Sequence, residues 1–371
     1  MADDIDGWKP LHRNAYLGDV KAVQAMMPGG GKETDENNLT ALHVAAYRGH
    51  LPIIEILLPH SDVNAQDENG RTALHWAAFM GNPHVIERLR QVKGIKVNLQ
   101  MKNGLTALHM GVASEQKDDP GKQKNVIKEL LLFDGIDLNV PDENNLRPLH
   151  WAALRGYHEI AKLLRGADTS VKDKNGLTPL HSAATNGHHQ FIEMLIDWGA
   201  DQNAVDDNQR TPMYWAAYNG YNKSVSLLIN SDIAKGDKKK LTPLHVSGSN
   251  GHKETVEKLL EKLSRTNREA VDSPDANKRT PLMWSAYMGH YDIVQLFLQH
   301  NANVNAADKD GYTALHWAAM ADELKVVQLL LENGANASIR DSKGRTAGDL
   351  ADALANTDVV KAIESKVGKS A

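Results

Sequence analysis

The sequence contains no cysteine and no long run of apolar residues. The absence of cysteine excludes disulfides, thiolate zinc sites and thiol catalysis, and it fits a reducing compartment. Apolar stretches such as residues 53–58 are far too short to span a bilayer. The opening residues 1–8 are acidic and lack the basic region and apolar core of a secretory signal. We therefore expect a cytoplasmic protein, with a nuclear location also open.

An excess of positive charge is absent as well. The 371 residues include 42 Lys and Arg against 47 Asp and Glu, which gives a net charge of −5. No global field therefore attracts nucleic acid or an acidic membrane, and we expect neither nucleic-acid binding nor membrane insertion. Hydrophobic residues make up 41% and charged residues 24%, which is typical of a folded protein and not of a disordered chain.

What the sequence does contain is an internal repeat. The stretch TALHWAA at residues 72–78 returns unchanged at residues 313–319. Positions equivalent to Thr72 recur, by subtraction, every 31 to 41 residues. The eleven repeats use up nearly the whole chain and leave no room for a separate catalytic domain. The equivalent positions are Lys9, Thr40, Thr72, Thr106, Arg147, Thr178, Thr211, Thr242, Thr280, Thr313 and Thr346.

Each repeat begins with the signals of a turn and a helix start. Asp67 and Gly70 suit the first and fourth positions of a type I turn. Thr72 follows as a helix cap, because its hydroxyl can accept one of the orphan amides of the first turn. Several repeats carry proline directly after this position, where the helix needs no amide donor.

The rest of each repeat predicts two short helices that pack only on their neighbours. Leu74, Ala77 and Ala78 fall on one helical face, and the small alanines allow a neighbouring helix to approach closely. Gly81 ends the first helix, and residues 85–89 supply the apolar stripe of a second. Helices this short are marginal alone, so the repeats are expected to stack into a solenoid.

Several stretches resemble the ankyrin repeat turn by turn. They include TPLHSAA at residues 178–184, GH at 187–188 and DQNA at 201–204, with TALH, GH and DVNA at 40–43, 49–50 and 62–65. The resemblance covers the entire chain. It implies an all-α ankyrin-repeat solenoid of stacked helix-turn-helix units, joined by hairpin-like turns and curved around a concave groove.

We expect residues 1–371 to form a single ankyrin-repeat array. Residues 1–35 and 342–371 are predicted to be its N-terminal and C-terminal capping repeats, because terminal repeats that face water are atypical. Repeat 4 is long, and we expect a loop near residues 114–125, for which a solvated segment is favoured over a partner contact. Repeat 8 is extended near residues 261–277, where a bend in the stack and a docking feature both stay open.

Three repeats depart from the pattern. Arg147 replaces the capping threonine, while Tyr214 and Met283 stand where other repeats have histidine. We expect these changes to lower stability locally.

Histidine is abundant, but its pattern points to structure. The resemblance implies that the recurrent histidine links the capping threonine to neighbouring backbone. His188 and His189 have no further ligand at metal spacing. We therefore predict no catalytic, cofactor or metal site, and a protein that is not an enzyme. The recurrent histidines are His12, His43, His75, His109, His150, His181, His245 and His316.

Two other motifs carry little information. Residues 27–34 contain three glycines and a lysine, but they lack the spacing and the hydroxyl residue of a phosphate-binding loop. The three lysines at 238–240 favour a solvated turn over a nucleic-acid contact, because no basic stripe extends them.

The resemblance implies partner contacts at the turn tip before the cap and at the two positions before the helix-ending glycine. Residues at these positions are rich in Tyr, Arg, Met and Phe, which are types favoured at interfaces. Partial packing on neighbouring repeats is the alternative. The candidate protein-binding residues are Tyr16, Tyr47, Arg48, Arg71, Phe79, Met80, Arg155, Arg210, Tyr218, Arg279, Tyr287, Met288 and Tyr312.

Five of the seven tryptophans follow directly after the position of the recurrent histidine. A role in the packing framework is favoured, and a stripe of indoles that lines the groove stays open. These residues are Trp76, Trp151, Trp215, Trp284 and Trp317.

An extended concave surface of this kind suits protein binding. We expect a monomeric, non-enzymatic scaffold or adaptor that holds one or more partner proteins in its groove. The alternative is a regulatory or targeting subunit of an enzyme complex with catalysis in the partner, which fold alone does not separate from the first.

Overall fold

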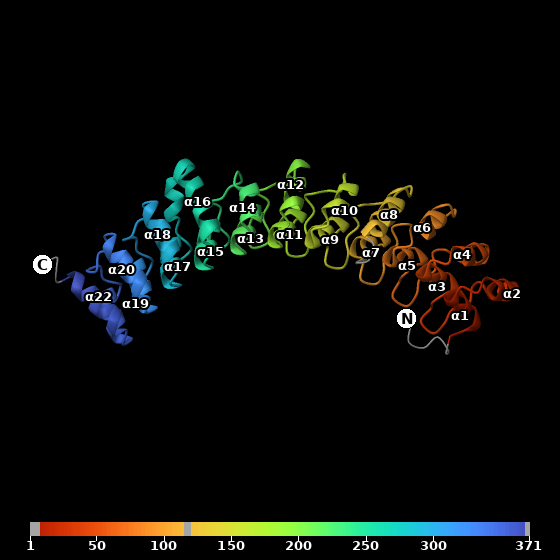
Figure 1. Ribbon diagram of the computed structural model, residues 1–371, viewed down its shortest axis with the longest axis horizontal. Helices are drawn as coiled ribbons and strands as arrows, with labels where there is room; N and C mark the ends of the chain where they lie inside the picture. The colour runs from red at the N-terminus through yellow and green to blue at the C-terminus, as the bar shows by residue number, and fades with distance from the viewer. Residues whose placement is uncertain (1–7, 115–119, 368–371) are drawn as a thin grey trace. The chain divides into compact units, whose positions relative to one another are not determined.

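The computed structural model describes residues 8–114 and 120–367, which form eleven helix pairs and no strand. The pairs follow one another along the chain in Figure 1. The first helices are α1 (Pro10–Leu17), α3 (Ala41–Arg48), α5 (Ala73–Met80), α7 (Ala107–Ala113), α9 (Pro148–Arg155), α11 (Pro179–Thr185), α13 (Pro212–Tyr218), α15 (Pro243–Ser249), α17 (Pro281–Tyr287), α19 (Ala314–Met320) and α21 (Ala347–Ala353). The second helices are α2 (Val20–Gly30), α4 (Leu51–Leu57), α6 (Pro83–Arg90), α8 (Pro120–Leu131), α10 (His158–Leu163), α12 (His189–Asp197), α14 (Asn222–Leu228), α16 (Lys253–Thr266), α18 (Tyr291–Gln299), α20 (Leu324–Glu332) and α22 (Thr357–Val367).

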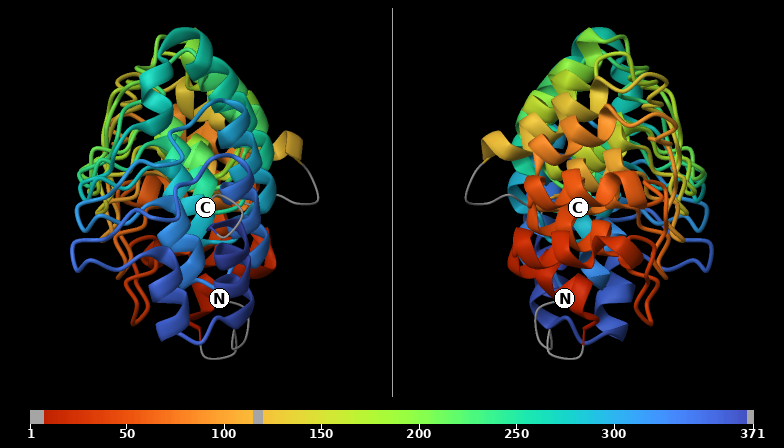
Figure 2. Two further views of the ribbon diagram at one scale, coloured as in Figure 1. Left: turned by 90° about the vertical axis from the view of Figure 1, so that its left-hand side faces the viewer. Right: turned by 90° about the vertical axis from the view of Figure 1, so that its right-hand side faces the viewer.

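The chain divides into two compact units, residues 1–174 (unit 1) and 175–371 (unit 2). In unit 1 the first helices contact one another in order from α1 to α9, and in unit 2 from α11 to α21. The second helices form a parallel series of contacts in each unit. In each unit the turns lie along one side of the helices (Figure 2). The all-α stack of helix-turn-helix repeats that the sequence predicts is confirmed.

Small residues let the first helices pack closely. Ala77 and Ala78 of α5 are fully buried, and so are Ile86 and Leu89 of α6 behind them. The helices are especially close at Gly248 in α15, where an added Cβ would lie 2.6 Å from the hydroxyl of a serine in α17. Packing this dense leaves no room for a larger side chain at Gly248.

In most repeats that have it, the recurrent histidine ties the helix start to the next repeat. The N–H of Thr40 donates to Nδ1 of His43 at 3.0 Å, and Nε2 of His43 lies 2.9 Å from the carbonyl of Ala65. In most other repeats Nε2 contacts the carbonyl just before the next cap, as His245 does with Arg279 at 3.1 Å. Because Nδ1 accepts a backbone N–H, the proton of the neutral ring must sit on Nε2 and donate to that carbonyl.

The departures from the pattern keep part of this network. The sulfur of Met283 accepts the N–H of Thr280 at 3.4 Å, as a histidine nitrogen would. The N–H of Arg147 donates to the ring of His150 at 3.2 Å, and its guanidinium donates to the carbonyl of Lys172 at 3.0 Å. These contacts offset some of the local loss that the sequence predicts.

The two long repeats differ from one another. Helix α8 already begins at Pro120, so residues 120–125 of the expected loop are helical, and residues 115–119 lie outside the described residues. The buried side-chain amide of Gln123 in α8 donates to the carbonyl of Val112 in α7 at 2.8 Å, which ties the two helices together. In repeat 8, α16 extends past Leu260 to Thr266 and is followed by a 3-10 turn, η3 (Arg268–Asp272).

The buried histidines predict that stability falls in mild acid. Burial lowers the pKa of His75, His109 and His245 from 6.5 to about 4. Between pH 4 and pH 6.5 the unfolded chain binds more protons than the folded chain. The contribution of these neutral histidines to the free energy of unfolding is therefore fully present above about pH 6.5 and is lost as the pH falls toward 4. At pH 5, these three side chains together should bind about three protons from the solvent when the chain unfolds. Urea unfolding followed by circular dichroism at pH 7, 6 and 5 measures the slope.

The chain offers its own control for this prediction, because Met283 occupies the same position in repeat 9 without titrating. His245→Met should reduce the proton uptake by about one, whatever its effect on absolute stability. An unchanged pH slope in this variant would contradict the assignment.

Candidate functional site

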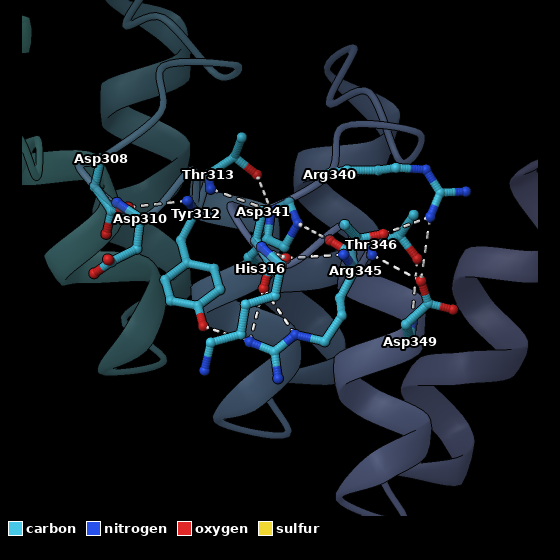
Figure 3. A network of polar contacts seen from close by, with 12 residues as sticks. Asp308, Asp310, Tyr312, Thr313, His316, Arg340, Asp341, Arg345, Thr346 and Asp349 are labelled. Carbon is cyan, nitrogen blue, oxygen red and sulfur yellow. Dashed lines mark hydrogen bonds and ion pairs between the residues drawn. The ribbon is translucent and has the colours of Figure 1, made fainter.

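An aspartate organises the turn before most of the first helices, although Met101 opens the turn before α7. In the turn that opens with Asp206, Oδ1 accepts the N–H of Asn208 at 2.8 Å and that of Arg210 at 2.9 Å. Figure 3 shows the same arrangement at Asp308 and Asp341. The remaining turns built in this way open with Asp35, Asp67, Asp142, Asp237 and Asp275.

Backbone hydrogen bonds connect neighbouring turns within each unit. In unit 1, the N–H of Glu68 donates to the carbonyl of Asn37 at 2.8 Å. In unit 2, the N–H of Lys238 donates to the carbonyl of Asn208 at 2.9 Å, and further turns repeat the contact. The turn tips are therefore held in register, with little freedom to move independently.

The tryptophans are fastened to these turns through the second carboxylate oxygen. Each of these indole N–H groups donates to Oδ2 of the aspartate nine residues earlier. The sequence analysis did not predict this hydrogen bond, although the constant spacing between Asp and Trp in five repeats is a signal for it. Trp76 is buried and the other four are half-buried. The donor–acceptor distances are 3.3 Å for Trp76, 3.1 Å for Trp151, 3.3 Å for Trp215, 3.2 Å for Trp284 and 3.2 Å for Trp317.

Arginines at the end of three turns lie over the indole rings. The guanidinium carbon of Arg71 is 4.6 Å from the ring centre of Trp76, and that of Arg210 is 4.2 Å from Trp215. Arg210 also donates from Nε to Oδ2 of Asp206 at 2.8 Å. A cation–π contact and an ion pair thus hold the side chain of Arg210 in place.

Four aromatic residues of unit 1 form a continuous series of ring contacts. Trp8 contacts Tyr16 edge-on at 5.4 Å between ring centres, Tyr16 stacks on Tyr47 at 6.4 Å, and Tyr47 meets Trp76 edge-on at 5.5 Å. The guanidinium of Arg48 lies 4.6 Å from the ring centre of Tyr16. Beside this series is a pocket of about 460 Å³, lined by Asn37, Leu39, Tyr47, Asp67, Glu68, Asn69, Arg71, Trp76 and Phe79.

Unit 2 contains a smaller and more apolar pocket. It has a volume of about 260 Å³ and is lined by Arg279, Met283, Trp284, Tyr287 and Trp317. Tyr287 meets Trp317 edge-on at 5.4 Å between ring centres. The guanidinium of Arg279 lies 4.6 Å from the ring centre of Trp317 and 5.7 Å from that of Trp284.

The backbone under several predicted contact residues is fixed by the next repeat. Nε2 of His50 contacts the carbonyl of Tyr16 at 3.1 Å, and Nε2 of His252 contacts that of Tyr218 at 2.9 Å. Side chains on such a backbone are presented in a defined direction, which lowers the entropy lost on binding.

The predicted contact residues divide by exposure. Tyr16 and Tyr47 are half-buried because they pack on neighbouring rings, which is the alternative left open by the sequence. Phe79, Tyr218 and Tyr287 are 41%, 44% and 41% exposed. Arg48, Arg155 and Met288 are exposed too, whereas Arg71, Met80, Arg210, Arg279 and Tyr312 are half-buried. Only some of the predicted contact residues line the two pockets just described, namely Tyr47, Arg71, Phe79, Arg279 and Tyr287. The residues that line neither are Tyr16, Arg48, Met80, Arg155, Arg210, Tyr218, Met288 and Tyr312.

The described residues contain no group of three or more His, Asp or Glu side chains that could hold a metal ion. In the same residues, no helix is both long enough and apolar enough to cross a membrane.

Comparison with known proteins points to one family. The family model described as "Ankyrin repeats (3 copies)" matches overlapping segments from residue 1 to residue 364. The crystal structure of the ankyrin repeat domain of Bcl-3, described as a unique member of the IkappaB protein family, has a TM-score of 0.53 and 28% identity. It covers 60% of this chain and 100% of its own.

A second similarity is short. The probable palmitoyltransferase AKR2 of Saccharomyces uvarum is 42% identical over 50 residues, which is 14% of this chain. The match spans only 7% of that curated relative.

The carboxylate–indole contact predicts a specific stability loss. In Asp142→Asn, the amide oxygen can still accept the two backbone N–H groups, but its NH₂ would face the indole N–H of Trp151. Two donors without an acceptor should lower the free energy of unfolding by about 1–3 kcal/mol, measured by chemical denaturation.

Asp237→Asn is the matched control for that substitution. Asp237 binds its turn in the same way, but Val246 stands nine residues later in place of a tryptophan. We expect a smaller loss there. Equal losses in the two variants would show that the indole contact contributes nothing.

Proposed function

The chain belongs to the ankyrin-repeat family, and we propose that it is a non-enzymatic scaffold or adaptor that binds one or more partner proteins. The binding face is formed by the turns and the first helices of its repeats. Ankyrin repeats generally mediate protein–protein interaction. The absence of cysteine supports a reducing compartment, and we place the protein in the cytoplasm or the nucleus.

One observation carries this proposal: large aromatic side chains stand exposed on a rigid backbone. Phe79, Tyr218 and Tyr287 each occupy the same position, near the end of a first helix, and are more than two-fifths exposed. Aromatic side chains on pre-ordered elements are the usual anchors of protein interfaces, because they bury much area and lose little entropy.

The state of the histidines supports a non-enzymatic role. In His75, one ring nitrogen accepts the N–H of Thr72 at 3.2 Å and the other contacts the carbonyl of Leu105 at 3.2 Å. Burial lowers the pKa of His75 to about 4. A ring with both nitrogens engaged and no access to solvent is not available as a general base.

The test compares two sets of serine substitutions in affinity capture from the native source, read by mass spectrometry. Phe79→Ser, Tyr218→Ser and Tyr287→Ser together should lower capture of the main partner at least about tenfold. Leu132→Ser with Tyr291→Ser removes two exposed apolar side chains, one just after α8 and one at the start of α18, and should leave capture unchanged.

Both sets should retain the helix content of the wild type by circular dichroism. Full capture by the first set would overturn the proposed face. If the captured protein is an enzyme present in stoichiometric amount, the chain is a regulatory or targeting subunit of that enzyme.

A further inference from the structure

We propose that unit 2 binds an acidic peptide segment of a partner protein, and that one large apolar side chain of this segment enters the pocket between Trp284, Tyr287 and Trp317. This inference rests on the proposed function and names the chemistry of the partner. Three observations carry it: the charges on three adjacent turns, the register of those turns and the composition of the pocket.

The turns at residues 237–241, 275–279 and 308–312 carry five exposed lysines. In the part of the chain that the structure describes, none of them takes part in an ion pair. The aspartate that opens each turn is occupied by backbone N–H groups, which leaves Asp310 as the exposed carboxylate among these turns. The lysines are Lys238, Lys239, Lys240, Lys278 and Lys309.

Three turns of unit 1 have the opposite charge at the equivalent place, whereas Lys102 and Lys174 occupy it in two others. The residue that follows the opening aspartate is Glu36, Glu68 or Glu143 in these three turns, and all three are exposed. The backbone there is built in the same way as in unit 2, so the difference lies in the side chains. A partner that selects by charge would therefore distinguish the two units.

Hydrogen bonds set the three basic turns side by side. The N–H of Ala276 donates to the carbonyl of Lys239 at 2.8 Å, and the N–H of Lys309 donates to that of Asn277 at 2.9 Å. The lysines therefore form a row beside the pocket, because Arg279 ends the middle turn and also lines the pocket wall.

The pocket favours an uncharged apolar side chain over a cation. Three aromatic rings could in principle receive a cationic group, but the guanidinium of Arg279 already lies against Trp317 and near Trp284. Its Nε makes no hydrogen bond among the described residues, but it lies 3.7 Å from Oδ2 of the buried Asp308, in an ion pair. The cationic position over these rings is therefore already filled, and the attraction for a carboxylate next to the apolar side chain comes from the lysines of the turns.

These features favour a peptide over nucleic acid. The lysines are confined to three turns, and the preceding turn carries Asp207. Arg279 and Tyr287 cover parts of the indole rings on which a base would stack. The net charge of −5 over the chain opposes a polyanion that extends beyond these turns.

The experiment measures fluorescence anisotropy of a labelled peptide with the full chain. The probe has about nine residues, enough when extended to pass three turns, and consists of Asp and Glu around one central Phe. We expect binding that weakens at least about tenfold when Phe becomes Ser, or when the acidic residues become Lys. Raising the salt from about 50 to 300 mM should also weaken it.

Variants of the protein locate the site. Lys278→Glu with Lys309→Glu should weaken binding about tenfold, while Lys325→Glu on α20, away from the turns, should not. Tyr287→Ser should weaken binding of the Phe peptide and leave the weaker Ser peptide unaffected.

Three results would overturn the inference: tighter binding of the lysine peptide, tighter binding of single-stranded oligothymidine of the same length, or full affinity in the double lysine variant. If the acidic peptide does not bind, but capture of the native partner still depends on Phe79, Tyr218 and Tyr287, only this inference is wrong. Capture that is independent of those residues removes the proposed function itself.

Discussion

A neutral histidine that joins two repeats is the interaction on which the rest of this structure depends. Its Nδ1 accepts the N–H of its own helix cap, and its Nε2 donates to a carbonyl at the end of the next turn. The helix start, the tautomer and the position of the following turn are therefore set together. Because the link crosses from one repeat to the next, helices too short to be stable alone become parts of a stack within each unit.

The turn aspartates extend this constraint to the surface. Each carboxylate uses one oxygen for its own turn and, in five repeats, the other for a tryptophan of the same repeat. The indole is thus both part of the framework and, on its remaining surface, part of a pocket wall. The two roles that the sequence left as alternatives for the tryptophans are compatible.

The positions that stabilise the repeats are different from the positions that are available to bind a partner. The positions that hold the repeats together are buried and nearly constant from repeat to repeat. The turn tips and the helix ends vary, and their side chains stand on backbone that the neighbouring repeat has fixed. Charge can therefore reverse between Glu68 in one unit and Lys238 in the other without changing the turn that carries it.

The sequence by itself determined the helix pairs, their caps and their order, because these depend on local signals such as Thr72 and Gly81 that recur in most of the repeats. It also determined which positions are candidates for contact. Only the tertiary structure decided that Tyr16 and Tyr47 pack on one another, that Trp284 and Trp317 form a pocket with Arg279, and that residues 120–125 are helical. Those outcomes depend on contacts between residues of different repeats, or on how one segment fits against its neighbours. A pattern within one repeat does not contain that information.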